Sequence, residues 1–276
     1  MIDTDIQYAA AGVLATGEPG EKAAAARSCA AAWRAGKLAV SAPGTPSCAP
    51  DRPRRPVKPE LKSPAEVPRR RLNSVKGRFA LLHAVAHIEF NAIDLAFDLI
   101  ARFAGDSRVA GDDRRAFIDD WIGVGDDEAR HFEMVRARLK SLGGDYGDLP
   151  AHDGLWSAAQ DTASCLKARL AIAPMVLEAR GLDVTPTMME RLRSAGDKES
   201  ADILNVIYTE EVAHVAAGRR WFEYLCARDG DAPKAQFQTL VKHYFKGDLK
   251  RPFNEDARAA AGLPEDWYAP LADAQL

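Results

Sequence analysis

The chain has 276 residues, 37 Lys plus Arg against 40 Asp plus Glu, and a hydrophobic share of 47%. A formal charge of −3 excludes a protein that binds polyanions through its bulk charge, and the composition excludes collagen-like and disordered chains. No stretch reaches the roughly 18 consecutive apolar residues of a membrane-spanning helix, so we expect no membrane association.

The chain start and the cysteines bear on the cellular compartment. The opening residues, MIDTDIQ, contain two Asp and no Lys or Arg, whereas a signal peptide begins with a basic region. The four cysteines are far apart and form no CxxC pair, which favours neither a disulfide framework nor a sulfur-rich zinc site. We therefore expect a protein of the reducing cytoplasm.

Two segments precede the main helical region. Residues 1–42 are Ala-rich and predict two modest helices, one after Thr4 and one from Pro19 to about Gly36. Residues 43–72 hold eight of the 16 prolines, which is too many residues without an N–H for a helix or a central strand. We expect an extended arm there.

The arm is basic. Between Asp51 and Arg71 it has eight Lys or Arg against three acids. Two interpretations are open: a strap lying across the protein's own acidic surface, or an anchor for RNA or another polyanion. We favour the strap, because no aromatic residue is interleaved to stack on bases.

From Asn73 onward, apolar residues recur at three- and four-residue spacing, which predicts helices. The expected helices are residues 75–104, 113–142 and 157–182, a short helix starting at Thr185-Pro186, residues 198–228, and residues 232–246 before an irregular tail. Several are long enough for an antiparallel bundle. We predict an all-α protein, with a ferritin-like four-helix bundle at 73–230 and a C-terminal helix and tail at 231–276.

Two of these helices carry the same motif. The sequence DEARH occupies residues 127–131 and EEVAH occupies residues 210–214. In both, a Glu and a His are three residues apart, which places them on one helix face a single turn apart. Each face is otherwise apolar, so each Glu-x-x-His pair can bind one metal ion.

The other two long helices each place one acid on an apolar face, Glu89 and Glu178. An ionised carboxylate is not left unpaired in a core. The order is therefore Glu then Glu-x-x-His, twice, with 128 − 89 = 39 and 211 − 178 = 33 residues between the first and second Glu. This repetition is consistent with two similar hairpins related by a pseudo-twofold axis.

Charge arithmetic favours two divalent cations, because four carboxylates and two neutral imidazoles then form a neutral cluster. A ligand set without thiolate disfavours structural zinc and suits iron or manganese, with the ions roughly 3.5 to 4 Å apart. A homodinuclear site and a mixed one both remain open.

The motifs also carry a resemblance. DEARH matches the D-E-x-R-H motif of di-iron oxygenases, and EEVAH matches its looser E-E-x-x-H form. With HAVAHIEFNAIDLAFD at 83–98 and LEARGLDVTP at 177–186, the chain resembles, over roughly residues 50–260, a bacterial ferritin-like family of uncharacterised function. That family is similar to the di-iron monooxygenases that hydroxylate modified tRNA.

This resemblance implies a set of metal ligands and their supporting residues. The six implied ligands are Glu89, Glu128, His131, Glu178, Glu211 and His214. It also implies that Asp127 and Glu210 accept the outer N–H of the opposite hairpin's histidine. Arg130 has Ala213 as its counterpart in the second motif, which breaks the symmetry.

Several further residues have two interpretations. Tyr208 lies one turn before Glu211 and is either a redox-active phenol or, as we favour, core filling. His83, His87, Asp94 and Asp98 form either a second metal site or, as we favour, hydrogen bonds to neighbouring elements. Pro174, one turn before Glu178, predicts a kink that either shapes the site or is structural.

The function we expect is an iron-dependent oxidoreductase of the hydroxylase or monooxygenase type, acting with dioxygen on an organic substrate. The resemblance makes a modified tRNA nucleoside one candidate substrate. An external reductase is expected, because the sequence has no dinucleotide-binding or rubredoxin-like motif. The alternatives are a ferroxidase or iron-handling protein and a non-catalytic metal-binding protein; a homodimer is compatible with each.

Overall fold

The computed structural model describes residues 4–63, 66 and 72–273. In these ranges the regular structure is helical, apart from a short parallel pair of β1 (Thr4–Asp5) with β2 (Leu38–Ala39) and one isolated bridge. The predicted all-α class is confirmed. None of the described helices is both long and apolar enough to cross a membrane.

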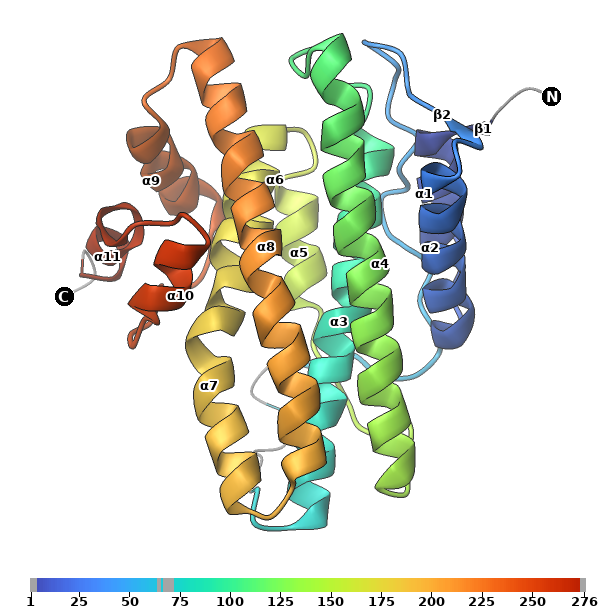
Figure 1. Ribbon diagram of the computed structural model, residues 1–276, viewed down its shortest axis with the longest axis vertical. Coiled ribbons are helices and arrows are strands. Elements are labelled where there is room, and N and C mark those ends of the chain that lie inside the picture. Colours follow the sequence, from blue (N-terminus) through green and yellow to red (C-terminus); the bar gives the residue numbers. More distant parts are fainter. Residues whose placement is uncertain (1–3, 64–65, 67–71, 274–276) are drawn as a thin grey trace. The chain divides into compact units, whose positions relative to one another are not determined.

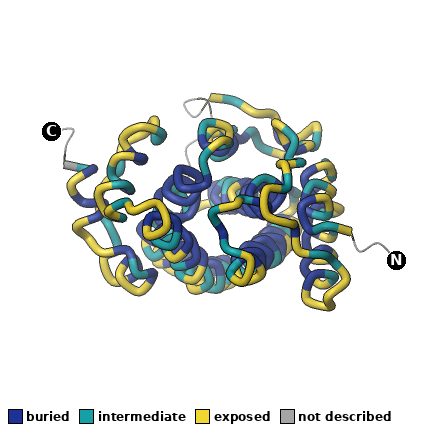
Figure 2. Tube along the Cα trace, turned by 90° about the horizontal axis from the view of Figure 1, so that it is seen from above, coloured by how far each residue is buried: buried dark blue, intermediate teal, exposed yellow. Residues whose placement is uncertain are grey.

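Contacts between residues divide the chain into two compact units. The first unit comprises Met1–Trp156 with Arg191–Ile203, and the second comprises Ser157–Glu190 with Leu204–Leu276. Colouring the chain by burial shows that helices present buried residues on one side and exposed residues on the other (Figure 2). This is the pattern expected of amphipathic helices.

The first unit is built on two long antiparallel helices, α3 (Val75–Phe103) and α4 (Gly111–Ser141), which pack along each other. The N-terminal pair packs on them, with α1 (Ile6–Leu14) against α3 and α2 (Pro19–Arg34) against α4 (Figure 1). The starts follow local chemistry: Asp5 caps α1, Pro19 opens α2 and the Ser74 hydroxyl caps α3. These four helices agree with the predicted ones.

The arm is part of the first unit. Between β2 and residue 63 its described backbone has neither helix nor paired strand beyond the bridge of Leu61. Arg52 pairs with Asp153, and Arg55 lies 3.3 Å from Asp94. These contacts are those of a strap, while the arginines at 69–71 lie outside the described residues.

The remaining helices are α5 (Gly154–Asp161), α6 (Leu166–Ile172), the π-helix η2 (Ala173–Glu178), α7 (Ala179–Ser194), α8 (Lys198–Asp229), α9 (Pro233–Tyr244), α10 (Glu255–Ala260) and α11 (Glu265–Asp273). The predicted helices at 198–228 and 232–246 are confirmed as α8 and α9. Three other expectations are wrong.

The first error is the single helix at 157–182, which the structure breaks after Asp161 and again at η2. Pro174 is the second residue of η2 and has no N–H to donate to a carbonyl one turn back. The backbone accommodates this with a π-turn, in which the hydrogen bonds span five residues. A disturbance at Pro174 was expected; its π-helical form was not.

The second error is a helix start at Thr185-Pro186, because α7 runs through Pro186 without a break. Pro186 leaves the carbonyl of Leu182, four residues earlier, without its helical donor. The Asn254 side-chain amide donates to that carbonyl at 3.1 Å. A distant side chain thus replaces the missing hydrogen bond and the helix continues.

The third error is the irregular tail. Asn254 caps α10 through a hydrogen bond from the Ala257 N–H. Helix α11 carries Trp267, whose ring centre lies 5.6 Å from the ring centre of Phe237 in α9. Both helices are short, and Gly262 and Pro270 interrupt the apolar spacing between and within them. Tertiary packing, rather than periodicity, therefore stabilises these helices.

Candidate metal centre

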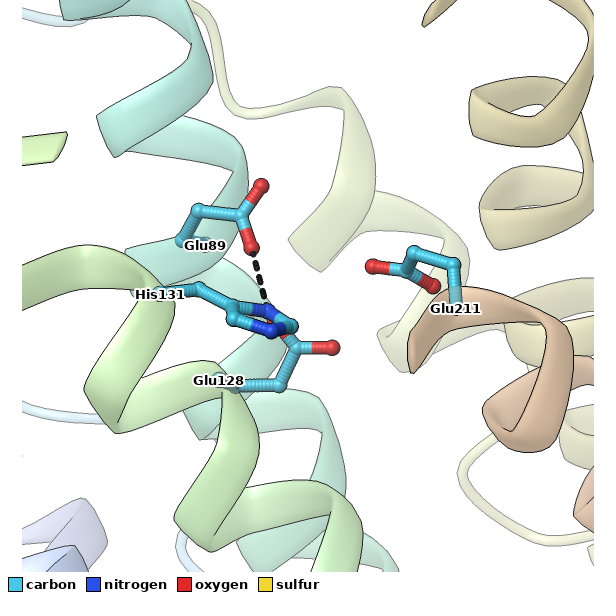
Figure 3. A group of neighbouring side chains, drawn as sticks. All are labelled: Glu89, Glu128, His131 and Glu211. Carbon is cyan, nitrogen blue, oxygen red and sulfur yellow. Dashed lines mark ion pairs between the residues drawn. The ribbon is translucent and has the colours of Figure 1, made fainter. Parts of the chain in front are cut away.

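The first unit gathers three of the predicted ligands. Glu89 comes from α3, Glu128 and His131 come from α4, and all three are buried, with exposed fractions of 3%, 0% and 0%. His131 Nδ1 lies 3.3 Å from Glu89 Oε2 and 3.5 Å from Glu128 Oε2 (Figure 3). One ligand atom from each residue lies within 4.8 Å of the others. Glu211, also drawn, belongs to the second unit and is described with it below.

The electrostatics of this group favour a cation. Burial by itself lowers the pKa of His131, but hydrogen bonds and charges from Glu128 and Glu89 outweigh it and raise that pKa to about 11. Even with the imidazole protonated, two carboxylates leave the buried group at a net charge of −1. A metal ion at Nδ1 would replace the proton and balance the carboxylates. The group of Glu89, Glu128 and His131 could therefore hold a metal ion.

The second unit contains the other Glu-x-x-His pair, on α8. His214 Nδ1 lies 3.6 Å from Glu211 Oε2, and the two residues are 3% and 9% exposed. The Nδ1 atom faces the carboxylate of the preceding turn, as it does between His131 and Glu128. Glu178, the remaining predicted ligand, is half-buried and is the last residue of η2.

The predicted supporting residues have contacts of their own. Arg130 donates to the Asp127 carboxylate at 2.9 Å, which gives the arginine of the DEARH motif a partner within its own helix turn. Glu210 is half-buried on α8. A contact of Asp127 or Glu210 with the opposite hairpin's histidine stays a prediction. The Tyr208 hydroxyl accepts a hydrogen bond from the Asn254 amide at 3.0 Å, as a structural role would require.

The two other histidines of α3 bind the α4–α5 loop. His83 Nε2 accepts the backbone N–H of Gly147 at 2.9 Å, and His87 Nε2 donates to the His152 carbonyl at 3.0 Å. The Tyr146 hydroxyl then donates to His87 Nδ1 at 2.8 Å. Burial lowers the pKa of His87 to about 4, so the ring is neutral near pH 7. These are the contacts with neighbouring elements that we favoured.

The two aspartates of that helix face form ion pairs. Asp94 is completely buried and pairs with Lys22 of α2 and with Arg55 of the arm, while Asp98 pairs with Arg102 at 2.9 Å. Sequence reasoning missed Lys22 and Tyr146. The signal for Lys22 was a lone lysine in an Ala-rich amphipathic helix, whose buried face predicts a partner.

Fold and site together define an all-α protein with a buried carboxylate and histidine group that could hold a metal ion. The family model described as "Protein of unknown function (DUF455)" matches residues 15–269, and the chain belongs to this family. It is 42% identical over 216 residues to a Haemophilus influenzae protein described as uncharacterized, covering 77% of this chain and 75% of that protein. No solved structure matches the chain.

Proposed function

We propose that this protein is a non-haem di-iron oxidoreductase that uses dioxygen to hydroxylate an organic substrate. The observation that carries the proposal is the repeated geometry of the Glu-x-x-His pairs, with Nδ1 to Oε2 separations of 3.5 Å in the first unit and 3.6 Å in the second. Nδ1 is directed at the carboxylate in both, which is the arrangement of two ligands sharing one ion. The proposed ligands are Glu89, Glu128, His131, Glu178, Glu211 and His214.

The donor set fits a pair of divalent ions. Four carboxylates carry four negative charges and two neutral imidazoles carry none, so two divalent ions give neutrality. Oxygen and imidazole ligands suit iron or manganese. A reduced iron pair would supply the electrons and the Lewis acidity with which dioxygen is activated. We expect electrons from a separate reductase, and the sequence resemblance makes a modified tRNA nucleoside one substrate to test.

The chain's own residues contribute position and environment. The i, i+3 spacing on α4 and α8 fixes each histidine beside its glutamate before any ion binds, which reduces the ordering needed on binding. Burial of Glu89, Glu128 and His131 excludes bulk water and strengthens the interaction between the carboxylates and a cation.

Metal content tests the proposal. Elemental analysis of protein from iron-supplied and manganese-supplied cells is expected to show two ions per chain. A Glu128→Ala/His131→Ala variant and a Glu211→Ala/His214→Ala variant are each expected to lose at least one ion. Glu133→Ala, an exposed glutamate on the same helix as Glu128, is the matched control and is expected to keep both.

Reactivity separates the enzyme from a binding protein. The iron-loaded, reduced protein is mixed rapidly with oxygenated buffer, and an absorbance change that both double variants lose is expected. Protein that binds no iron, or whose variants bind as much as the wild type, would contradict the metal site. Iron that binds but shows no absorbance change would contradict the oxidoreductase.

A further inference from the structure

The second unit contains a cavity of about 320 Å³. One side is formed by Val176 and Leu177 of η2, and another by the segment after α9, with Phe245, Leu249 and Phe253. The volume is at the lower end of the range of small-molecule sites, and walls of this kind suit an apolar body.

The charged residues at this cavity are mostly cations. Arg180, Lys250 and Arg258 line it, and Asp248 is an acid among the lining residues. Asp183 neutralises part of the charge through ion pairs with Arg258 and Arg180. Three cations against these two aspartates leave a net charge of +1, which favours an anionic ligand.

Arg258 is held rigidly at the cavity. Its side chain is 3% exposed, and its Nε and Nη2 each donate to Asp183 at 2.8 Å. The guanidinium carbon also lies 4.3 Å from the Tyr268 ring centre and 4.9 Å from that of Phe253. An arginine fixed in this way is preorganised to bind an oxyanion.

One part of this guanidinium lacks a partner. Arg258 Nη1 is buried and has no hydrogen-bond acceptor in the described part of the chain. A buried charged donor without an acceptor is energetically costly. Since Asp183 already occupies the other two nitrogens, the cavity that Arg258 lines is where an added acceptor could bind.

The segment that closes the cavity is anchored from α7. Arg180 Nη1 donates to the carbonyl of Lys250 at 2.7 Å and to that of Pro252 at 3.2 Å. These bonds fix the backbone on which Leu249 and Lys250 stand. The cavity is therefore built from several elements of the second unit.

We propose that this cavity binds an organic anion, a carboxylate or phosphate on an apolar or aromatic body, and that this is the substrate class of the protein. The oxyanion accepts hydrogen bonds from Arg258 and Lys250, while the apolar part of the ligand packs on Phe245 and Leu249. Val176 and Leu177 directly precede Glu178, so the ligand contacts the turn that carries a proposed metal ligand. The assignment as substrate rests on the proposed function; the binding does not.

Calorimetry on the full, metal-free chain tests binding with three probes of similar size. Phenyl phosphate, benzoate and benzyl alcohol share an aromatic body and differ in the oxyanion. We expect one or both anions to bind at least about tenfold more tightly than the alcohol, as loss of a charge-assisted hydrogen bond implies. The stronger of the two anions identifies the group.

Variants locate the site. Lys250→Gln changes an exposed side chain. It is expected to lower the affinity for the anions about three- to tenfold and to leave the affinity for benzyl alcohol unchanged. Lys242→Gln, an exposed lysine of α9 outside the cavity, is the matched control and is expected to bind as the wild type does. Leu249→Trp fills the cavity and is expected to abolish binding. Arg258→Lys is expected to have a larger effect than Lys250→Gln, with circular dichroism to establish folding.

Equal affinity for the three probes, or equal effects of the two lysine variants, would overturn the binding site. The substrate assignment has its own readout: a bound anion is expected to change the rate at which the reduced, iron-loaded protein reacts with oxygen, and Lys250→Gln to need more anion for that change. Anion binding by a protein that takes up no iron when iron is supplied would support the anion site and contradict the proposed function. Iron binding without anion binding would contradict the anion site and leave the proposed function in place.

Discussion

The Glu-x-x-His pairs of the two units share a spacing but differ in the backbone that carries the third proposed ligand of each half. His131 lies between two carboxylates, at 3.3 and 3.5 Å, and both belong to uninterrupted α-helices. His214 lies 3.6 Å from Glu211, and the third proposed ligand of its half, Glu178, ends a π-helix. The repeated sequence pattern therefore does not extend to a repeated backbone.

This difference predicts that the two halves bind a metal ion with unequal affinity. The group of Glu89, Glu128 and His131 is already assembled within one unit, so a cation binding there needs little rearrangement. The second half depends on a turn whose hydrogen-bond pattern is irregular and which also forms a cavity wall. We expect the first half to bind the tighter ion.

The largest expected effect is on metal affinity. His131→Ala removes the ligand atom that two carboxylates surround, and is expected to lower the affinity for the more tightly bound ion by at least about a hundredfold. His214→Ala is expected to lower mainly the affinity for the other ion. Titration against a chelator of known affinity measures both. His243→Ala, an exposed histidine of α9, is the control, and equal losses in the two ligand variants would contradict the inequality.

The next effect is the pH dependence of the metal-free protein. The pKa of His131 is raised from 6.5 to about 11, so the folded chain holds a proton that the unfolded chain releases. The resulting stability is complete below pH 6.5 and is lost as the pH rises toward 11, by about 1.4 kcal/mol per pH unit. Urea unfolding at pH 7, 8 and 9 measures the slope.

His131→Gln cannot bind this proton and is expected to flatten that slope. Iron-loaded protein is expected to lack it as well, because the ion takes the place of the proton. A slope that persists unchanged in His131→Gln would assign the proton to another group.

Sequence periodicity was sufficient where a helix is long and one-sided. The apolar spacing of α3, α4 and α8 located these helices within a few residues, and the i, i+3 rule placed His131 beside Glu128 and His214 beside Glu211. Both results depend on local geometry alone.

The features that sequence could not predict depend on distant partners. Pro186 is accommodated in α7 because Asn254, 68 positions later in the chain, donates to the Leu182 carbonyl. The buried Arg55 to Asp94 contact and the Tyr146 to His87 hydrogen bond likewise join segments far apart in sequence. No periodicity reports such pairings, and the cavity beside Arg258 has the same origin.

A smaller effect on the free energy of unfolding is expected when a glycine beside each motif is replaced by alanine. A Cβ added at Gly218, one turn after His214, would overlap the Pro174 ring, whereas one at Gly125, three residues before Glu128, would lie 2.6 Å from Phe97 Cε2. A proline ring is fixed to its backbone and a phenyl ring can turn, so Gly218→Ala is expected to destabilise by about 1–3 kcal/mol and Gly125→Ala by less. Gly123→Ala, with no atom within 4 Å, is the control and is expected to be neutral or stabilising in urea unfolding.

The smallest effect concerns the position three residues before each motif glutamate, which is Gly125 in the first motif and Tyr208 in the second. Tyr208→Phe removes the hydroxyl that accepts a hydrogen bond from Asn254. Because Asn254 is only half-buried, water can replace the hydroxyl as the acceptor. We therefore expect the free energy of unfolding to fall by about 0.5–1.5 kcal/mol. Asn254→Ala also removes the bond to Leu182 and the cap of α10 and is expected to cost more. If Tyr208 only positions Asn254, the iron-loaded Tyr208→Phe protein reacts with oxygen as the wild type does. A changed absorbance trace with unchanged stability would instead make the tyrosine a participant in the redox chemistry, a role for which the first motif, with glycine at this position, has no equivalent.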